Sequence, residues 1–514
     1  MLIVQPLPGV IMGRKIESNH QQGMLFPPHL DDLLPKDHPA RFINEFVEQL
    51  SFDELNFTEP QSTRGRSFYS SKMLLKIWLF GLFDGIRSTR KLELACKNNI
   101  GLVWLTGMHY PDHNTIWRFW KNNKKQLKSL FKETVVVSKK LNLIGFALQA
   151  IDGTFIESLV NKNNSLHREE LEKLLQELDK NIEEIASEIE SNQTSEDSPS
   201  YSLPEHLQEK QALREEIESA LDFMSEINRD HVNPKDPDCR MIKKRGKSKF
   251  GYNGQIAVDS KNQLIVAQDL CNDESDNSLL VPMLDNAKEM LEESVENTVA
   301  DAGYFSGKQL HEADEKNYNV LVDLGSYYGY KARADIYPKD LFSYDKDRDV
   351  FICPHGQELE YKSKKTHHSR KYKYRKYLCK SGDSCPYRQH CTKSKSGRSI
   401  KLHPNEDTIQ KQKEKQKSPD AKYLLSRRKV VVEPVFGQIK HNLNFRRFTV
   451  TGIEKVQTQW ALMCTTYNLR KIYKAWSTRV KPFIRIFYRI FSNDILKRRD
   501  LNHYKDKLII ISQN

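Results

Sequence analysis

The spacing of apolar residues changes from a helical to a strand period near Ile144, and this change divides the chain. Before it, apolar residues recur at helical intervals in four segments, 40–52, 71–83, 88–98 and 114–141. Ser71 and Asn114 stand where helix N-caps are expected, and Pro111 precedes the last segment. We therefore predict an all-helical N-terminal domain over residues 1–145.

Beyond Ile144 the pattern alternates between strand and helix. The expected strands are 146–151, a hairpin of 254–259 and 263–268, then 297–300 and 318–324. The expected helices are 277–293, 307–316 and 426–443. Such an order predicts an α/β domain, which we bound at residues 146–475.

Three carboxylates stand at matching places in this order. Asp152 follows the first strand, Asp301 follows the fourth, and Glu433 lies on the last helix. This is the ribonuclease-H-like layout, a mixed sheet flanked by helices, in which three acids clamp two divalent ions. One ion activates the attacking oxygen and the other stabilises the leaving oxygen, and Mg²⁺ or Mn²⁺ suits oxygen ligands. Taken singly, Asp152 and Asp301 are more often turn formers than ligands.

Charge is distributed unevenly along the chain. The formal net charge is +13, which favours a polyanionic partner. Residues 163–228 carry 18 acids and 5 bases, so the rest of the chain carries +26. Within the acidic segment, a heptad seam (Leu171, Leu175, Leu178, Ile182, Ile185, Ile189) precedes a second stripe (Leu213, Ile217, Leu221, Met224). We expect a helical hairpin inserted into the domain; an interaction arm is the alternative.

A second insertion, residues 331–419, is basic and rich in tyrosine. The run KYKYRKY suits phosphate contacts and stacking on bases, and a solubilising insertion is an equal alternative. Cys353, Cys379, Cys385 and Cys391 lie here, and four thiolates could hold a structural Zn²⁺. No Cys-x-x-Cys knuckle is present, so reduced cysteines without metal are an equal reading.

No apolar run is long enough for a membrane span, which needs about 20 residues. The first residues are apolar before they are charged, the wrong order for a signal peptide. Eight cysteines in 514 residues do not make a disulfide scaffold. These features predict a cytoplasmic protein without a membrane partner.

Several motifs together resemble the DDE-class transposases of bacterial insertion sequences, in the branch with an all-helical N-terminal domain. They are DHPARFINEFVEQL, GIRSTRKLELACKNNIGLVWLTG, PDHNTIWRFWK, AIDGTFIES, KFGYNGQIAVDSKNQLIVAQDLCNDESDN, VADAGY and VEPVFGQIKHNLNFRRF. The resemblance implies metal-dependent DNA cleavage at transposon ends and strand transfer into target DNA. It implies that Asp152, Asp301 and Glu433 are the catalytic metal ligands. Double-stranded DNA, as terminal inverted repeats and target, is then the partner, and a homodimer would hold the two ends.

The sequence departs from the family pattern just before Glu433. The family has an Arg four residues before this glutamate and a Tyr three residues earlier, where this chain has Lys429 and Ser426. Either Arg428 substitutes for the arginine or Lys429 supplies a point charge. This departure leaves an inactive or domesticated transposase, acting as a sequence-specific DNA-binding protein, as the alternative function; a related nuclease that cleaves without joining is another.

Basic residues near these motifs are candidate DNA contacts. Lys440 shares a helix side with Glu433, and Arg446 and Arg447 follow that helix. Helix–turn–helix texture in the first domain suggests further phosphate contacts by Arg87, Arg90 and Arg118; ordinary packing helices are the alternative. The basic tail, residues 476–514, could contact DNA, a partner subunit or the core, and the sequence does not distinguish these roles.

Overall fold

The protein is described here by a computed structural model. The structure describes residues 29–57, 68–160, 166–191, 205–226, 231–233, 235–244, 247–324, 336–367, 372–379, 381 and 384–478. Most of the predicted tail, from residue 479 onward, lies outside the described residues.

Helices account for most of the chain up to residue 140, as predicted. They are η1 (Leu30–Leu33), α1 (Pro39–Glu48), α2 (Ser71–Phe83), α3 (Thr89–Asn98), α4 (Ile100–Thr106), α5 (His113–Asn122) and α6 (Lys124–Lys140). The prediction of a single helix over 114–141 is wrong, because the helix is interrupted at Asn123, between α5 and α6. Both expected N-caps are also displaced: Ser70 and Asp112 accept the capping hydrogen bonds from Met73 and Thr115.

A six-stranded mixed sheet forms the centre of the molecule, with the strand order β4-β5-β1-β7-β8 and with β6 also paired to β5. Its strands are β1 (Gln149–Glu157), β4 (Arg240–Lys244), β5 (Lys247–Asp259), β6 (Ile265–Cys271), β7 (Thr298–Ala300) and β8 (Val320–Val322). β5 is long enough to pair with β1 along one edge and with both β4 and β6 along the other. β1, β7 and β8 run parallel to one another.

The first strand does not end before Asp152, as the sequence suggested. β1 continues through Asp152 and Gly153 because each residue from Gln149 to Glu157 pairs with β5. The Asp-Gly pair is therefore strand and not turn, and the Asp152 side chain projects from a sheet face.

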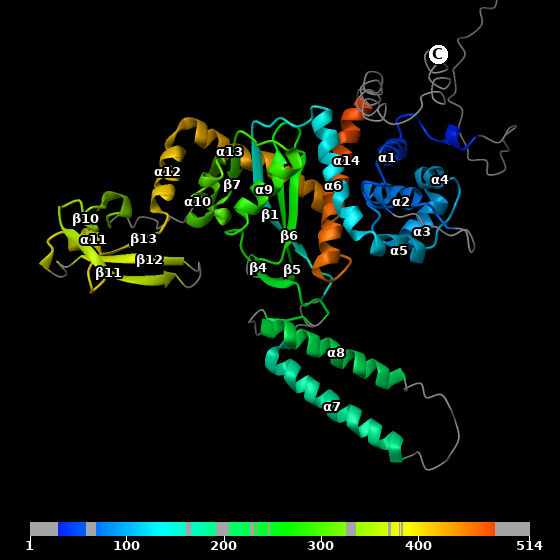
Figure 1. Ribbon diagram of the computed structural model, residues 1–514, viewed down its shortest axis with the longest axis horizontal. Coiled ribbons are helices and arrows are strands. Elements are labelled where there is room, and N and C mark those ends of the chain that lie inside the picture. The colour runs from blue at the N-terminus through cyan, green and yellow to red at the C-terminus, as the bar shows by residue number, and fades with distance from the viewer. Residues whose placement is uncertain are drawn as a thin grey trace, which may run out of the picture.

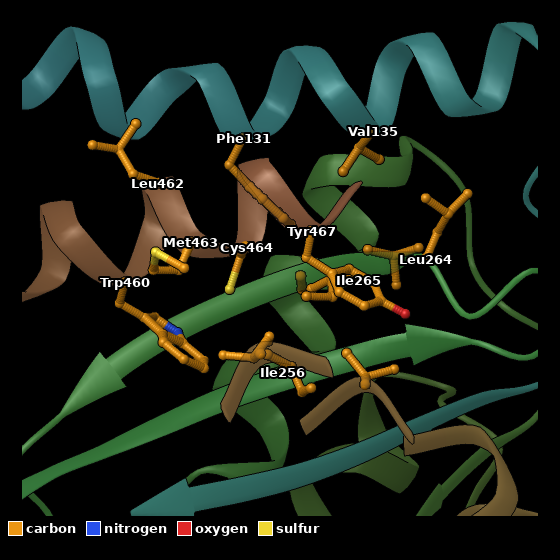
Figure 2. Close-up of a cluster of buried hydrophobic side chains, with 14 of the residues drawn as sticks. Phe131, Val135, Ile256, Leu264, Ile265, Trp460, Leu462, Met463, Cys464 and Tyr467 are labelled. Carbon is orange, nitrogen blue, oxygen red and sulfur yellow. The ribbon is translucent and has the colours of Figure 1, made fainter. Parts of the chain in front are cut away.

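Long helices cover the face of β5 that carries Gly254 and Ile256. There α14 (Ile453–Thr478) lies between the sheet and α6, with Trp460 and Tyr467 against the strands and Phe131 and Val135 above (Figure 2). A Cβ at Gly254 would lie 3.0 Å from the Trp460 ring, so the helix approaches the strand closely. Because α6 belongs to this same core, the N-terminal helices and the sheet share one continuous apolar interior.

Further helices pack around the central sheet. They are α9 (Leu280–Leu291), η3 (Ala302–Tyr304), α10 (Gly307–Glu315), α12 (Glu406–Lys417) and α13 (Pro419–Gly437), which runs into the π-helical turn η7 (Gln438–Asn442). α13 begins seven residues before the expected Ser426, with Ser418 as its N-cap. α13 packs across β1 and β7.

The predicted helical hairpin is present and has its own small core. It consists of α7 (Arg168–Ser191) and α8 (Glu205–Glu226), which extend away from the sheet (Figure 1). Leu171 and Leu178 are buried against Ile217, Ala220 and Met224. Leu213, expected on the same stripe, is 39% exposed. The two-residue strands β2 (Leu166–His167) and β3 (His231–Val232) pair at its base.

The basic insertion contains a separate antiparallel sheet, which Figure 1 shows on the side of the central sheet away from the N-terminal helices. Its elements are η5 (Lys339–Leu341), β9 (Ser343–Asp345), β10 (Val350–Ile352), β11 (Glu358–His367), β12 (Tyr372–Cys379), α11 (Arg388–Cys391) and β13 (Ser399–Leu402). Phe342, Phe351, Leu359, Tyr377 and Ile400 form its core.

Candidate active site

Two of the predicted acids emerge side by side from neighbouring parallel strands. Ile151 of β1 lies opposite Ala300 of β7. Asp152 is the next residue of β1, and Asp301 is the first residue after β7. Asp301 begins the turn η3, where its carboxylate accepts a hydrogen bond from the backbone N–H of Gly303 at 2.8 Å. The sheet register alone therefore brings these two carboxylates to one edge.

The Asp152 carboxylate is held in a mostly buried setting. Its Oδ2 accepts a hydrogen bond from Nη1 of Arg428 at 2.8 Å, and its Oδ1 accepts one from the backbone N–H of Gly153. Burial, and next the negative charge of Asp301, raise the pKa of Asp152 to about 6, while Arg428 opposes this rise. The site thus disfavours a second negative charge unless a cation is near.

Glu433 is carried past these acids by α13. Five residues before it, Arg428 contacts Asp152. Seven residues after it, Lys440 donates to the Thr154 hydroxyl and, at 3.0 Å, to the carbonyl of Phe155. Both anchors are on β1, so Glu433 lies on the stretch of helix held against that strand, and its side chain is exposed.

The same contacts concern position 429, where the family has an arginine and this chain has a lysine. Arg428 is 13% exposed and faces Asp152, whereas Lys429 and Ser426 are exposed on α13. Arg428 is therefore the basic residue of this helix that reaches the acids.

The other predicted DNA contacts fall into two groups. Arg446 and Arg447 follow η7 beside the end of β1, where Arg447 pairs with Glu157 at 3.2 Å. Arg87 donates to the carbonyl of Arg447 at 3.1 Å and is partly buried, which lowers its pKa. Arg90 on α3 and Arg118 on α5 are exposed. Arg87 thus joins the helical region to the segment after η7, a packing role that sequence reasoning did not anticipate.

Sequence reasoning also missed a polar group beside the two aspartates. Asp276, on the loop between β6 and α9, accepts hydrogen bonds from the side chains of Asn253 and Gln255. Gln255 in turn accepts one from the buried Tyr304 hydroxyl. A signal in the sequence was available, because two amide side chains, two positions apart, interrupt the largely apolar run 250–258 of β5.

The four cysteines of the basic insertion converge on one small cavity, which His355 and Tyr387 also line. Backbone N–H groups of His355 and Gln357 donate to the Cys353 sulfur at 3.4 and 3.2 Å. Burial raises the pKa of the Cys391 thiol, and the neighbouring cysteines oppose its ionisation. Sequence spacing did not reveal this convergence, because the four residues come from different turns and strands.

Carboxylate oxygens are the donors that Mg²⁺ and Mn²⁺ prefer, so Asp152 and Asp301 fit a divalent cation by chemistry. Across the part of the chain that the structure describes, no group of three or more His, Cys, Asp or Glu side chains has the arrangement of a metal site. In the same residues, no helix is long and apolar enough to cross a membrane.

Two protein families match the chain. A Transposase domain (DUF772) matches residues 28–122, and a Transposase DDE domain matches residues 352–473, which include Glu433. No curated protein matches. Among solved structures, a piggyBac transposase synaptic complex with hairpin DNA is 10% identical, with a TM-score of 0.30 over 93% of this chain and 84% of that one.

The N-terminal helical region and the part of the chain that carries Glu433 thus each match a transposase domain. These two matches support a DDE transposase of the insertion-sequence kind.

Proposed function

We propose that this transposase cleaves DNA at the ends of its element and joins the freed ends to target DNA, using Asp152, Asp301 and Glu433 with Mg²⁺ or Mn²⁺. The observation that carries the proposal is the pairing of Ile151 with Ala300, which sets two aspartates side by side beneath the helix of Glu433. The strand order, with β1 between β5 and β7, supports a ribonuclease-H-like catalytic domain.

The divalent cations would lie between these carboxylates, activate the attacking oxygen and offset charge on the leaving oxygen. The protein's own residues supply the rest. Arg428 and Lys440, anchored along β1, would meet phosphate oxygens on either side of Glu433. Arg446 and Arg447 would extend this contact along the DNA backbone, and the partly buried Arg87 would steady their segment.

We assign a separate task to each region. Residues 1–145 would bind the terminal inverted repeats, with Arg90 and Arg118 exposed toward DNA, and residues 146–475 would carry the chemistry. Neither of these two tasks is assigned to the insertions at 163–228 and 331–419 or to the tail at 476–514. A homodimer would hold two ends together, and the protein would act in the cytoplasm.

For the four cysteines we propose a structural Zn²⁺. All four line one cavity, and backbone N–H groups are directed at the Cys353 sulfur. Zn²⁺ binding would draw the thiolates into a tetrahedral arrangement that they do not have in this structure. Elemental analysis of protein purified without chelator should find about one zinc per chain, as expected for one four-thiolate site. Absence of zinc from the wild type, or an unchanged zinc content in Cys379→Ser, would refute the assignment.

The test of the proposed function is cleavage and joining of a labelled duplex that carries the element's terminal repeat. The wild type should cut at the repeat boundary and join, while Asp152→Asn, Asp301→Asn and Glu433→Gln should bind the duplex and do neither. If the wild type binds but does not cut, the protein is a DNA-binding descendant of a transposase. If it cuts but never joins, a nuclease is the better description.

A further inference from the structure

Asp276 is the third aspartate beside the proposed reaction centre. Its Oδ1 accepts hydrogen bonds from Nδ2 of Asn253 and Nε2 of Gln255, both at 2.7 Å. Gln255 is fully buried. A carboxylate that accepts two amide donors at one oxygen has its orientation fixed, and its other oxygen is directed elsewhere.

The same network reaches the turn that follows Asp301. The Tyr304 hydroxyl donates to Oε1 of Gln255, and Tyr304 is fully buried in η3. Since η3 begins with Asp301 as its N-cap, Tyr304 ties this turn to β5 through Gln255. Asp276, β5 and the Asp301 turn are therefore joined by one continuous set of hydrogen bonds.

The second oxygen of Asp276 faces Asp301. A Cβ placed on Gly303 would lie 3.3 Å from Oδ2 of Asp276 and 2.9 Å from Oδ1 of Asp301. These two carboxylate oxygens thus border the same small space. On the other side, a Cβ on Gly153 would lie 2.9 Å from Oδ1 of Asp276. Glycines directly follow or flank both proposed catalytic acids, and each leaves room for Asp276.

Charge adds a second link between the three aspartates. The negatively charged carboxylates of Asp301 and Asp276 both lie near enough to repel the carboxylate of Asp152. Like charges this close are tolerated best when a cation lies among them. Asp276 therefore affects the electrostatics of the centre as well as its geometry.

We propose that Asp276 is a positioning residue of the reaction centre, which holds the Asp301 turn against β5 through Gln255 and Tyr304 and strengthens the attraction of the site for a divalent cation. This inference rests on the proposed function. Asp276 acts through Asp301 and Asp152, so its removal weakens cation binding while leaving DNA binding unchanged.

The test compares Asp276→Asn with the wild type in two measurements. The first is the rise in melting temperature as Mn²⁺ is added, and the second is the Mg²⁺ concentration that gives half-maximal cleavage of the terminal-repeat duplex. Both midpoints should rise roughly tenfold, as is typical when a residue that orients metal ligands is lost. Asp273→Asn, an exposed aspartate on the same loop, is the matched control and should change neither.

A milder variant guards against misfolding. Tyr304→Phe keeps the buried ring and removes only the hydroxyl that binds Gln255, so it should shift both midpoints in the same direction by less. Suppose that Asp276→Asn is folded and both of its midpoints are unchanged, while the wild type cleaves and Asp152→Asn does not. The inference about Asp276 is then wrong, and the proposed function stands. A wild type that neither cleaves nor responds to Mn²⁺ would overturn the proposed function and this inference together.

Discussion

Nη1 of Arg428 lies 2.8 Å from Oδ2 of Asp152, although 276 residues separate them in the chain. Both side chains are mostly buried, at 13% and 18% exposure. This ion pair joins the helix of Glu433 to the strand of the first acid. In the protein without cations, the Arg428 guanidinium is the main positive charge that offsets the Asp152 carboxylate.

Replacing Arg428 should therefore destabilise the cation-free protein. Arg428→Ala leaves a mostly buried carboxylate without its partner, and we expect a loss of about 3 kcal/mol in the free energy of unfolding at pH 7. The loss should shrink at pH 5, where Asp152, with its pKa of about 6, is largely protonated in the wild type. Urea denaturation in EDTA measures both values. Lys429→Ala, at an exposed neighbouring position, should have little effect at either pH.

Stability should also depend on pH through Asp152 itself. Its pKa is raised from 3.8 to about 6, so the folded protein holds this proton more tightly than the unfolded chain. The contribution of this proton to the free energy of unfolding is complete below pH 4. It is lost as the pH rises through 6, by up to about 3 kcal/mol. Relative to Asp152→Asn, the wild type should thus lose stability between pH 4 and pH 7 in EDTA. A constant difference in stability between the two proteins across this pH range would contradict the raised pKa of Asp152.

A side chain at Gly153 should disturb the site. A Cβ there would lie 2.4 Å from Nε2 of Gln255 and 2.9 Å from Oδ1 of Asp276. We expect Gly153→Ala to cost about 1–3 kcal/mol through overpacking and to reduce cleavage. Gly437→Ala is the matched control: nothing lies within 4 Å of its Cβ, and alanine favours helix. Thermal melts and the cleavage assay check both variants.

The helical hairpin should be removable. Its core is separate from the main core, and β2 pairs with β3 at its base, which brings the two chain ends together. Replacing residues 168–226 with a short Gly-Ser linker should change the melting temperature by only a few degrees. Light scattering on the same variant tests the interaction-arm alternative, because loss of a dimer that the wild type forms would support it.

The sequence predicted the element order well where periodicity is local. Both hairpin helices and the alternation from β1 to α13 follow directly from apolar spacing. The end of the first strand was missed, because pairing with β5 outweighs the turn preference of Asp-Gly. The break at Asn123 was also missed, since apolar spacing continues through it.

The site was predictable only in part. Asp152, Asp301 and Glu433 could be proposed from the sequence because two acids directly after short apolar runs and a third on a later helix have a recognisable order along the chain. The contact between Arg428 and Asp152 depends on how α13 packs on the sheet, which no local pattern encodes. The same holds for Asp276, whose two amide partners lie on another strand.

The position of α13 in the chain has a consequence for synthesis. The strand of Asp152 leaves the ribosome hundreds of residues before the helix that carries Glu433 and Arg428. Until that helix emerges and packs on β1, Asp152 has neither its cationic partner nor the third acid. If the chain cleaves DNA as proposed, a nascent or prematurely terminated chain would be unable to do so, and activity would require translation of nearly the whole chain.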